Sequence, residues 1–159
     1  MLRVKRIADK FGLNITTVCC DATNELPFSE RFDYVFQAGL LEHFYPEQRI
    51  DMLKKWKKNA KNMISLIPNA HCLAYRVGKQ ILEEKGTWEY GLEMPQSSLR
   101  WEFEQAGIEV LDEYTIDSAA ALKLLPNDHV LRVALEKMSD HYRLEDFGQG
   151  YLLVTIGKC

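Results

Sequence analysis

The stretch CDATNELPFSERFDYVFQAGLLEH, residues 20–43, carries the clearest architectural signals in this chain. A β-branched segment, residues 14–20, ends at Asp21, and a second apolar segment, residues 32–38, ends at Gly39. Both segments have the length and composition of strands. The second is continuously apolar rather than alternating, which is typical of a parallel strand covered on both faces. We therefore expect two strand ends to lie side by side, with Asp21 and Gly39 just beyond them.

The rest of the chain alternates between helical and strand patterns. Pro46 suits the first turn of a helix over residues 46–58, because its missing N–H would have no partner there. Residues 62–68 then form a predicted strand, and strand, helix, strand in this order indicates a right-handed parallel crossover. The fold class is therefore α/β. The other expected elements are helices over 2–11, 71–84, 97–106, 118–125 and 128–145, an irregular loop over 86–96, and strands over 108–116 and 151–158. The last strand can return antiparallel to its predecessor, although the sequence does not force this.

Composition and charge indicate a single globular domain over residues 1–159. The net charge of −3 gives no reason to expect a nucleic acid partner, and the basic run over residues 54–58 is typical of a solvated helix face. No apolar stretch approaches the roughly 18 to 20 residues that a membrane span needs, and the N-terminal stretch MLRVKRIADKFG has no apolar signal core. We therefore predict a cytoplasmic protein with no membrane partner.

The four cysteines form no C-x-x-C pair and show no metal-ligand spacing with histidine, so the sequence predicts no metal site. Cys19 and Cys20 fall within the predicted strand over residues 14–20. They are expected to be reduced thiols in the core rather than nucleophiles. Three histidines without a partner at a recognisable spacing are expected at the surface or at helix ends: His71, His129 and His141.

The predicted strand ends suit a ligand, because ligands of open parallel sheets bind beyond the carboxyl ends of the strands. The carboxylate of Asp21 can accept hydrogen bonds from an amine or a hydroxyl group. The backbone N–H of Ala22 can donate to a ring nitrogen, and Gly39 allows a ligand to approach the backbone closely. These groups together suit a nucleoside pocket. The alternative for Asp21 is a turn or helix cap, a common role of aspartate at a strand end.

Several segments together resemble one enzyme family. CDATNELPF, RFDYVFQAGLLEHF and MISLIPN are similar to the middle of class I S-adenosylmethionine-dependent methyltransferases, in particular the type 11 or ubiquinone-biosynthesis-like branch. GTWEYGLEMP and FEQAGIEVLDEY look like the tail of that family. The resemblance covers residues 1 to about 117 and is only generic over 118–145. It implies a Rossmann-like sheet of strand order 3-2-1-4-5-7-6 with helices on both faces, S-adenosylmethionine as cofactor, S-adenosylhomocysteine as product, and a small-molecule substrate.

Matched position by position, the resemblance also implies a site. Asp21 would meet the adenine amine, and the Ala22 backbone would read the ring. The cofactor-binding residues implied in this way are Asp21, Ala22, Thr23, Gln37, Ala38, Gly39 and Leu41. The implied substrate-binding residues are His43, Asn69, Trp88 and Tyr90, and His43 is also a candidate catalytic group. Two alternatives stay open: His43 equally suits a residue that leads into the helix at Pro46, and the loop aromatics equally suit anchors that hold the loop to the body.

One part of the family pattern is missing. Family members begin with a strand, a Gly-rich turn and a second strand ending in an acid that grips the ribose, whereas Gly12 is the only glycine before Gly39 here. We therefore expect an N-terminally truncated sheet that lacks its first two strands, with unpaired edges on the strands over 14–20 and 32–38. These strands could close up against each other, a separate polypeptide could complete the sheet, or a second copy could do so. The homodimer is the favoured outcome.

Two functions follow from these observations. In the first, the chain is a small-molecule methyltransferase, or a fragment of one, that uses S-adenosylmethionine. In the second, it is a non-catalytic, methyltransferase-like module for binding or assembly. Composition does not separate the two, because both require the same core.

Overall fold

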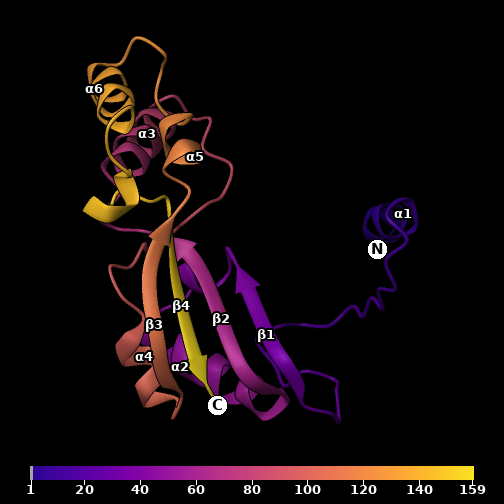
Figure 1. Ribbon diagram of the computed structural model, residues 1–159. Helices are drawn as coiled ribbons and strands as arrows, with labels where there is room; N and C mark the ends of the chain where they lie inside the picture. The colour runs from indigo at the N-terminus through magenta and orange to yellow at the C-terminus, as the bar shows by residue number, and fades with distance from the viewer. Residues whose placement is uncertain (1) are drawn as a thin grey trace.

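Four strands form the sheet in the computed structural model, which describes residues 2–159 and the side chains from Val4 onward. The strands are β1 (Phe32–Ala38), β2 (Ala60–Pro68), β3 (Glu109–Ile116) and β4 (Leu152–Lys158). Figure 1 shows them in the spatial order β1-β2-β4-β3. β1 and β2 run parallel, whereas β4 is antiparallel to both β2 and β3. The predicted α/β class and parallel crossover are thus confirmed, and the last strand does return antiparallel to its predecessor.

Helix α2 (Pro46–Trp56) makes the crossover from β1 to β2 and begins at Pro46, as the sequence predicts. It packs with helix α4 (Arg100–Gln105) against one face of the sheet (Figure 1). Between the two helices, the buried guanidinium of Arg49 donates to Glu102 Oε1 over 2.7 Å. The core on this face includes Leu53, Trp56, Met63, Ile67, Phe103 and Leu153.

The opposite face of the sheet is open at β1. Tyr34 and Phe36 on this strand are 63% and 71% exposed, and no helix of the described chain lies in front of β1 in Figure 1. The prediction of helices on both faces is therefore wrong for this strand. A continuously apolar sequence indicates that a strand can be buried on both sides, but it does not supply the second layer.

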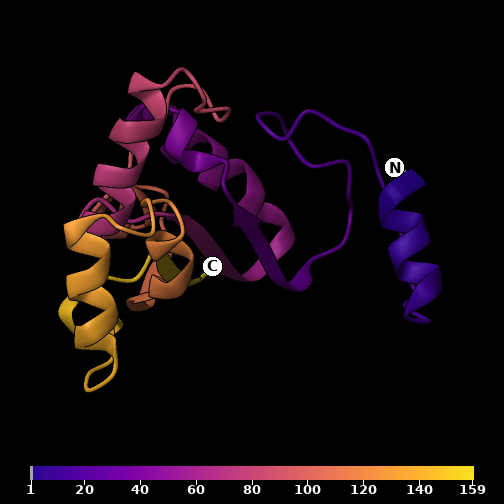
Figure 2. The ribbon, with the colours of Figure 1, turned by 90° about the horizontal axis from the view of Figure 1, so that it is seen from above.

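A second group of helices lies at the end of the sheet where β1 and β2 finish, as Figures 1 and 2 show. It comprises α3 (Leu73–Glu84), α5 (Ser118–Leu122) and α6 (Val130–Ser139). The three helices share a core cluster of their own, around Tyr75, Leu122 and Leu135. α3, which follows β2, and the chain between β3 and β4 thus build a small helical layer next to the strand ends, where ligands bind in open parallel sheets. None of the described helices is long and apolar enough to cross a membrane.

The expected helix over residues 128–145 is shorter than predicted. α6 ends at Ser139, and a 3-10 turn, Leu144–Phe147, follows. His129 lies at the start of α6, where its Nδ1 accepts the N–H of Leu131 over 3.2 Å. The predicted role of this histidine at a helix end is confirmed.

The N-terminal segment departs from the prediction. Helix α1 (Leu2–Lys10) forms and the chain turns at Gly12 with φ of +63°, but residues 14–20 form no strand. In both Figure 1 and Figure 2, α1 stands apart from the sheet. Strand propensity depends on neighbours that pair and pack, and no described strand lies beside this segment. The placement of Cys19 and Cys20 in a buried strand is wrong for the same reason, because both are exposed.

β1 is an edge strand, since β2 is its only partner in the described part of the chain. The first of the three expected outcomes, in which residues 14–20 and β1 close up as paired strands, is therefore not found. Completion of this edge by a second copy or by another polypeptide stays a prediction.

Candidate functional site

A cavity of about 320 Å³ opens beyond the carboxyl ends of β1 and β2. The start of β4 reaches the same edge, because β4 runs antiparallel to β2. The lining residues come from the strand ends, from the short turn after β1, and from the loop between α3 and α4. They are Ala38, Gly39, Glu42, His43, Pro68, Tyr90, Glu93, Tyr151 and Leu152. Four of the residues predicted for the site, Ala38, Gly39, His43 and Tyr90, are therefore brought together.

The turn after β1 is shaped by Gln37 and Gly39. The side-chain amide of Gln37 donates to Ser65 Oγ on β2, and its carbonyl oxygen accepts the N–H of Leu40 over 3.1 Å. Gly39 has a φ of +70°, a conformation that favours glycine, and its N–H donates to the carbonyl of Leu66 over 3.0 Å. Gln37 thus holds the turn, while Gly39 leaves the backbone open toward the cavity.

Glu42 is the least expected member of the cavity wall. Glu42 is only 2% exposed, and its Oε2 has no hydrogen-bond partner in the part of the chain that the structure describes. Burial raises the pKa of this carboxyl above its ordinary value. The backbone carbonyl of Glu42 accepts the N–H of Met94 over 2.7 Å, which draws the loop between α3 and α4 over the cavity.

His43 lies beside Glu42 with a defined ring orientation. Its Nδ1 is 2.6 Å from the carbonyl oxygen of Leu92. A carbonyl oxygen only accepts, so Nδ1 carries the proton and donates it to Leu92. In a neutral ring Nε2 is then the nitrogen without a proton, and it lies 4.0 Å from Glu42 Oε1. The ring therefore offers a lone pair on the cavity side.

Tyr151 and Glu93 complete the polar part of the cavity, and Tyr75 supports Glu93 without lining the cavity. The hydroxyl of Tyr75, on α3, donates to Glu93 Oε2 over 2.7 Å. The rings of Tyr75 and Tyr151 are 5.3 Å apart between centroids. Burial is the main reason why the pKa of Tyr75 is raised and why that of Tyr151 rises to about 12. Both hydroxyl groups therefore stay protonated near neutral pH and can donate.

The two loop aromatics have different surroundings. Tyr90 lines the cavity, whereas Trp88 does not. Trp88 packs at 6.4 Å from the ring of Tyr75 and 5.1 Å from that of Tyr90, and Lys79 Nζ lies 4.6 Å from its ring. Trp88 thus anchors the loop to α3, while Tyr90 faces the cavity.

A smaller apolar cavity of about 180 Å³ lies on the other side of the β1 end, lined in part by Ala22, Gln37 and Leu40. The carbonyl of Ala22 accepts the indole N–H of Trp56 over 2.8 Å, which fixes this segment against α2. Asp21, the residue before Ala22, is exposed. The strand over 14–20 is absent, yet the segment that follows it does reach the end of β1.

The Asp21 carboxylate organises its own turn. Oδ1 accepts the N–H and the hydroxyl of Thr23 over 2.9 and 2.8 Å, and Oδ2 accepts the Asn24 amide over 3.0 Å. The backbone hydrogen bond from Thr23 is the main cause of the lowered pKa of Asp21, so the group stays ionised. The turn-cap alternative is therefore what this structure contains, although a carboxylate has lone pairs for further donors.

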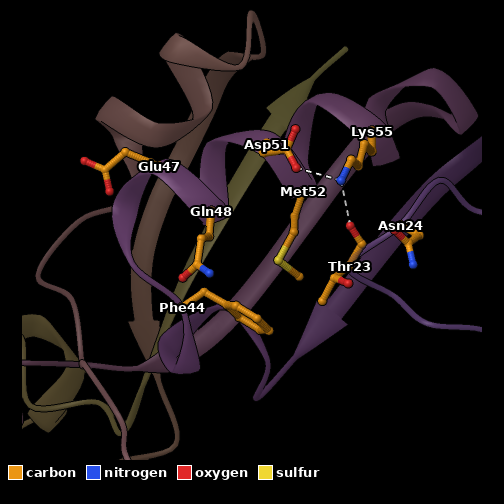
Figure 3. Close-up of a pocket in the computed structure, with 8 residues that line it drawn as sticks. All are labelled: Thr23, Asn24, Phe44, Glu47, Gln48, Asp51, Met52 and Lys55. Carbon is orange, nitrogen blue, oxygen red and sulfur yellow. Dashed lines mark hydrogen bonds and ion pairs between the residues drawn. The ribbon is translucent and has the colours of Figure 1, made fainter.

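A third hollow, of about 520 Å³, lies between this turn and α2 and is drawn in Figure 3. Its cation, Lys55, is already paired: Nζ lies 2.6 Å from Asp51 Oδ2 and donates to the carbonyl of Thr23 over 2.8 Å. Gln48 accepts the N–H of Tyr45 at the start of α2 over 3.0 Å. Lys55 thus holds the Thr23 turn on the helix, and Gln48 caps the start of the helix, so we assign this hollow a structural role.

Besides Trp88 and Asp21, two more predicted site residues line none of these cavities. Leu41 is completely buried and belongs to the main core. Asn69 is also buried, and its amide donates to the carbonyls of Gly148 and Gly150 over 2.8 and 2.9 Å. Asn69 thus holds the segment that leads into β4, where Tyr151 lies.

Sequence reasoning did not single out Glu42, Tyr75 or Tyr151. A signal for Glu42 was available, because an acid within the apolar run GLLEHF has to be buried or paired. No comparable signal exists for the tyrosines, since α3 and the start of β4 are far from Glu93 in sequence. The chain matches no model of a known protein family, and it has no significant match among curated proteins.

Proposed function

We propose that this chain is an S-adenosylmethionine-dependent methyltransferase that acts on a small molecule, or a fragment of one. The observation that carries the proposal is the strand order. β1 and β2 are parallel, and the last strand, β4, is inserted antiparallel between β2 and β3. This arrangement agrees with the final four strands, 4-5-7-6, of the sheet that the sequence resemblance implies.

The residues around the smaller cavity fit the adenosine end of such a cofactor. Ala22 and Leu40 offer an apolar slot for a flat ring, and the residue before Ala22, Asp21, is an exposed carboxylate whose pKa is lowered by the hydrogen bonds from Thr23. Beyond the β1 turn, Ala38 and Gly39 line the neighbouring cavity with open backbone. When bound, the cofactor would supply a methyl group already activated on a sulfonium. The protein then contributes mainly alignment and the exclusion of water.

The larger of these two cavities suits the methyl acceptor. It combines the rings of Tyr90 and Tyr151 with the unprotonated Nε2 of His43. Aromatic rings can hold the body of a small molecule, and Nε2 can take the proton that a hydroxyl or amine acceptor releases. His43 is therefore the candidate base for an acceptor that needs one.

A second function, an assembly module without turnover, is favoured by β1. The strand has an unpaired edge in the described chain and carries the exposed side chains of Tyr34 and Phe36. An exposed apolar edge strand invites pairing with another chain. If the chain is such a module, a homodimer forms through β1, and the cavities are remnants of a methyltransferase site without activity.

Calorimetric titration with S-adenosylhomocysteine separates the two functions. We expect binding by the wild-type chain, at a concentration where light scattering defines its oligomeric state. Asp21→Ala should weaken binding measurably, because it removes the carboxylate that would accept the adenine amine. Glu30→Ala removes an exposed carboxylate from the turn before β1 and is the matched control.

Either of two results would count against the methyltransferase proposal. The first is no heat up to millimolar ligand with a folded chain, and the second is equal affinity in the Asp21 and Glu30 variants. If binding is absent and Phe36→Asp converts a dimer into a monomer, the assembly function is the better account.

A further inference from the structure

We propose that Glu42, His43 and Glu93 bind a divalent transition-metal cation in the cavity beyond β1. One potential ligand atom from each of the three residues lies within 4.8 Å of those of the other two. Two of the residues belong to the turn after β1, and the third belongs to the loop that covers the cavity. The inference rests on this cluster and not on the methyltransferase proposal, and a cation bound to His43 Nε2 would prevent this nitrogen from acting as the base.

The state of Glu42 points to a missing partner. Its side chain is 2% exposed, and Oε2 makes no hydrogen bond within the described residues. A buried carboxylate oxygen without a donor or a cation is costly. Glu42 also lines the cavity, so a ligand that enters there can reach the carboxylate. A cation would supply the partner that the chain does not.

The ring of His43 is arranged as metal-binding histidines usually are. Metal-ligating histidines typically donate their second ring N–H to a carbonyl or a carboxylate, which fixes the tautomer. Here Nδ1 donates to the carbonyl of Leu92 over 2.6 Å, so the lone pair of Nε2 faces Glu42 Oε1 at 4.0 Å. The outer partner of this ligand is thus already in place.

Glu93 is likewise oriented by a hydrogen bond from a neighbouring side chain. The hydroxyl of Tyr75 donates to Glu93 Oε2 over 2.7 Å, which leaves Oε1 and further lone pairs for a cation. Metal bonds of about 2.1 Å bring ligand atoms to within roughly 3.0 to 3.6 Å of one another. The half-buried Glu93, on a loop, can make the closure of about 1 Å that this requires.

The donor set selects the class of cation. Two carboxylates balance a charge of +2, and an imidazole favours Mn²⁺, Fe²⁺, Co²⁺ or Zn²⁺ over Ca²⁺ and Mg²⁺, which prefer oxygen ligands. Three protein ligands leave coordination positions that face the cavity. An oxygen atom of a small molecule can occupy such a position, so the cation would orient a bound substrate.

Electron paramagnetic resonance titration with Mn²⁺ tests the site directly, because bound Mn²⁺ loses the six-line signal of the free ion. We expect one Mn²⁺ per wild-type chain and displacement by Zn²⁺. Glu42→Gln and His43→Ala should each lower the affinity at least about tenfold, since each removes a ligand. Glu47→Gln removes an exposed carboxylate from the first turn of α2 and should leave the affinity unchanged.

Thermal unfolding with and without Mn²⁺ guards against misfolded variants. A cation that binds only the folded chain raises the melting temperature, so the wild type and Glu47→Gln should show the shift and Glu42→Gln should not. The proposal is overturned if the folded wild type binds no Mn²⁺ or Zn²⁺ up to millimolar concentration. Equal Mn²⁺ affinity in Glu42→Gln and Glu47→Gln would overturn it as well. Neither readout uses S-adenosylhomocysteine or turnover, so this site and the methyltransferase proposal can fail separately.

Discussion

The hydroxyl of Tyr75 donates to Glu93 Oε2 over 2.7 Å, and this bond ties helix α3 to the loop that covers the cavity. Tyr75 is completely buried, and its raised pKa keeps the hydroxyl protonated. The same loop is held a second time, where the N–H of Met94 donates to the carbonyl of Glu42. Together with the bond from His43 Nδ1 to the carbonyl of Leu92, these hydrogen bonds hold the cover of the cavity from different parts of the chain.

Tyr75→Phe should loosen this cover while the fold persists. The ring stays, so the expected loss of unfolding free energy is about 1 kcal/mol, the net value of one such hydrogen bond. Hydrogen exchange at the Met94 amide should become faster, because loop opening no longer has to break the Tyr75 bond. Tyr142→Phe, at an exposed ring, is the control and should change neither quantity. Unaltered exchange at Met94 in Tyr75→Phe would contradict this account of the loop.

The predicted strands that proved correct are those whose neighbours are within the described chain. β1, β2, β3 and β4 were each recognisable from a short apolar run, and they pair with one another. Residues 14–20 have an equally strand-like composition but lack a neighbouring strand, and they form no strand. Composition therefore predicts the ability to form a strand, whereas pairing decides whether the strand exists.

The candidate site was predictable at its backbone but not at its acids. The rule that ligands bind beyond strand ends led to Ala38 and Gly39, which do line the cavity. The rule did not predict that Glu42 Oε2 has no hydrogen-bond partner. The lack of a partner depends on which side chains of the loop between α3 and α4 lie near Glu42 in the folded chain. Nor could the rule pair Tyr75 with Glu93, since that contact requires the position of α3 relative to the loop.

The ion pair of Arg49 and Glu102 should be the most sensitive polar contact in the core. It joins α2 to α4, both side chains are buried, and Arg49 Nε also donates to the carbonyl of Phe44 over 2.8 Å. Arg49→Met leaves Glu102 buried without a partner, so we expect a loss of about 3 to 5 kcal/mol in urea denaturation. The double variant Arg49→Met with Glu102→Leu should recover most of this loss.

An ion pair with an exposed carboxylate gives the comparison for this prediction. Lys79 and Glu83 form an ion pair one turn apart on α3, in which the side chain of Glu83 is 44% exposed and that of Lys79 is 12% exposed. Glu83→Gln should cost no more than about 0.5 kcal/mol, because solvent screens the charge of Glu83. If Arg49→Met costs as little as Glu83→Gln, the buried pair contributes nothing to the packing of α2 on α4.

Gly78 is predicted to resist replacement by the best helix former. It lies within α3, and an added Cβ would sit 2.6 Å from the Cβ of Leu124 and 3.0 Å from its backbone. Alanine gains about 1 kcal/mol of helix propensity, but overpacking costs about 1 to 3 kcal/mol, so Gly78→Ala should be neutral or destabilising. Gln80→Ala, at an exposed position of α3, should change stability by less than about 0.5 kcal/mol. A clear stabilisation by Gly78→Ala would show that Leu124 moves away freely.

Glu145 is predicted to make the helical layer sensitive to acid. Its Oε1 accepts the N–H of Ser118 at the start of α5 over 2.9 Å. Partial burial by itself raises the pKa of Glu145, but the hydrogen bonds from Ser118 together hold it below the ordinary value of 4.5. Because the folded pKa is the lower one, the stabilisation is present above the unfolded pKa and is lost as the pH falls through the folded pKa.

Urea denaturation of wild type and Glu145→Gln on both sides of this pH window tests the assignment. At about pH 7 the variant should be less stable, because glutamine offers Ser118 a neutral acceptor in place of a charged one. At about pH 3, where the carboxyl group is protonated in the unfolded chain and increasingly so in the folded one, the difference should shrink. Asp146→Asn, at the exposed neighbouring acid, should not reproduce this pattern. A difference between wild type and Glu145→Gln that stays constant from neutral to acid pH would mean that the charge of Glu145 does not stabilise the start of α5.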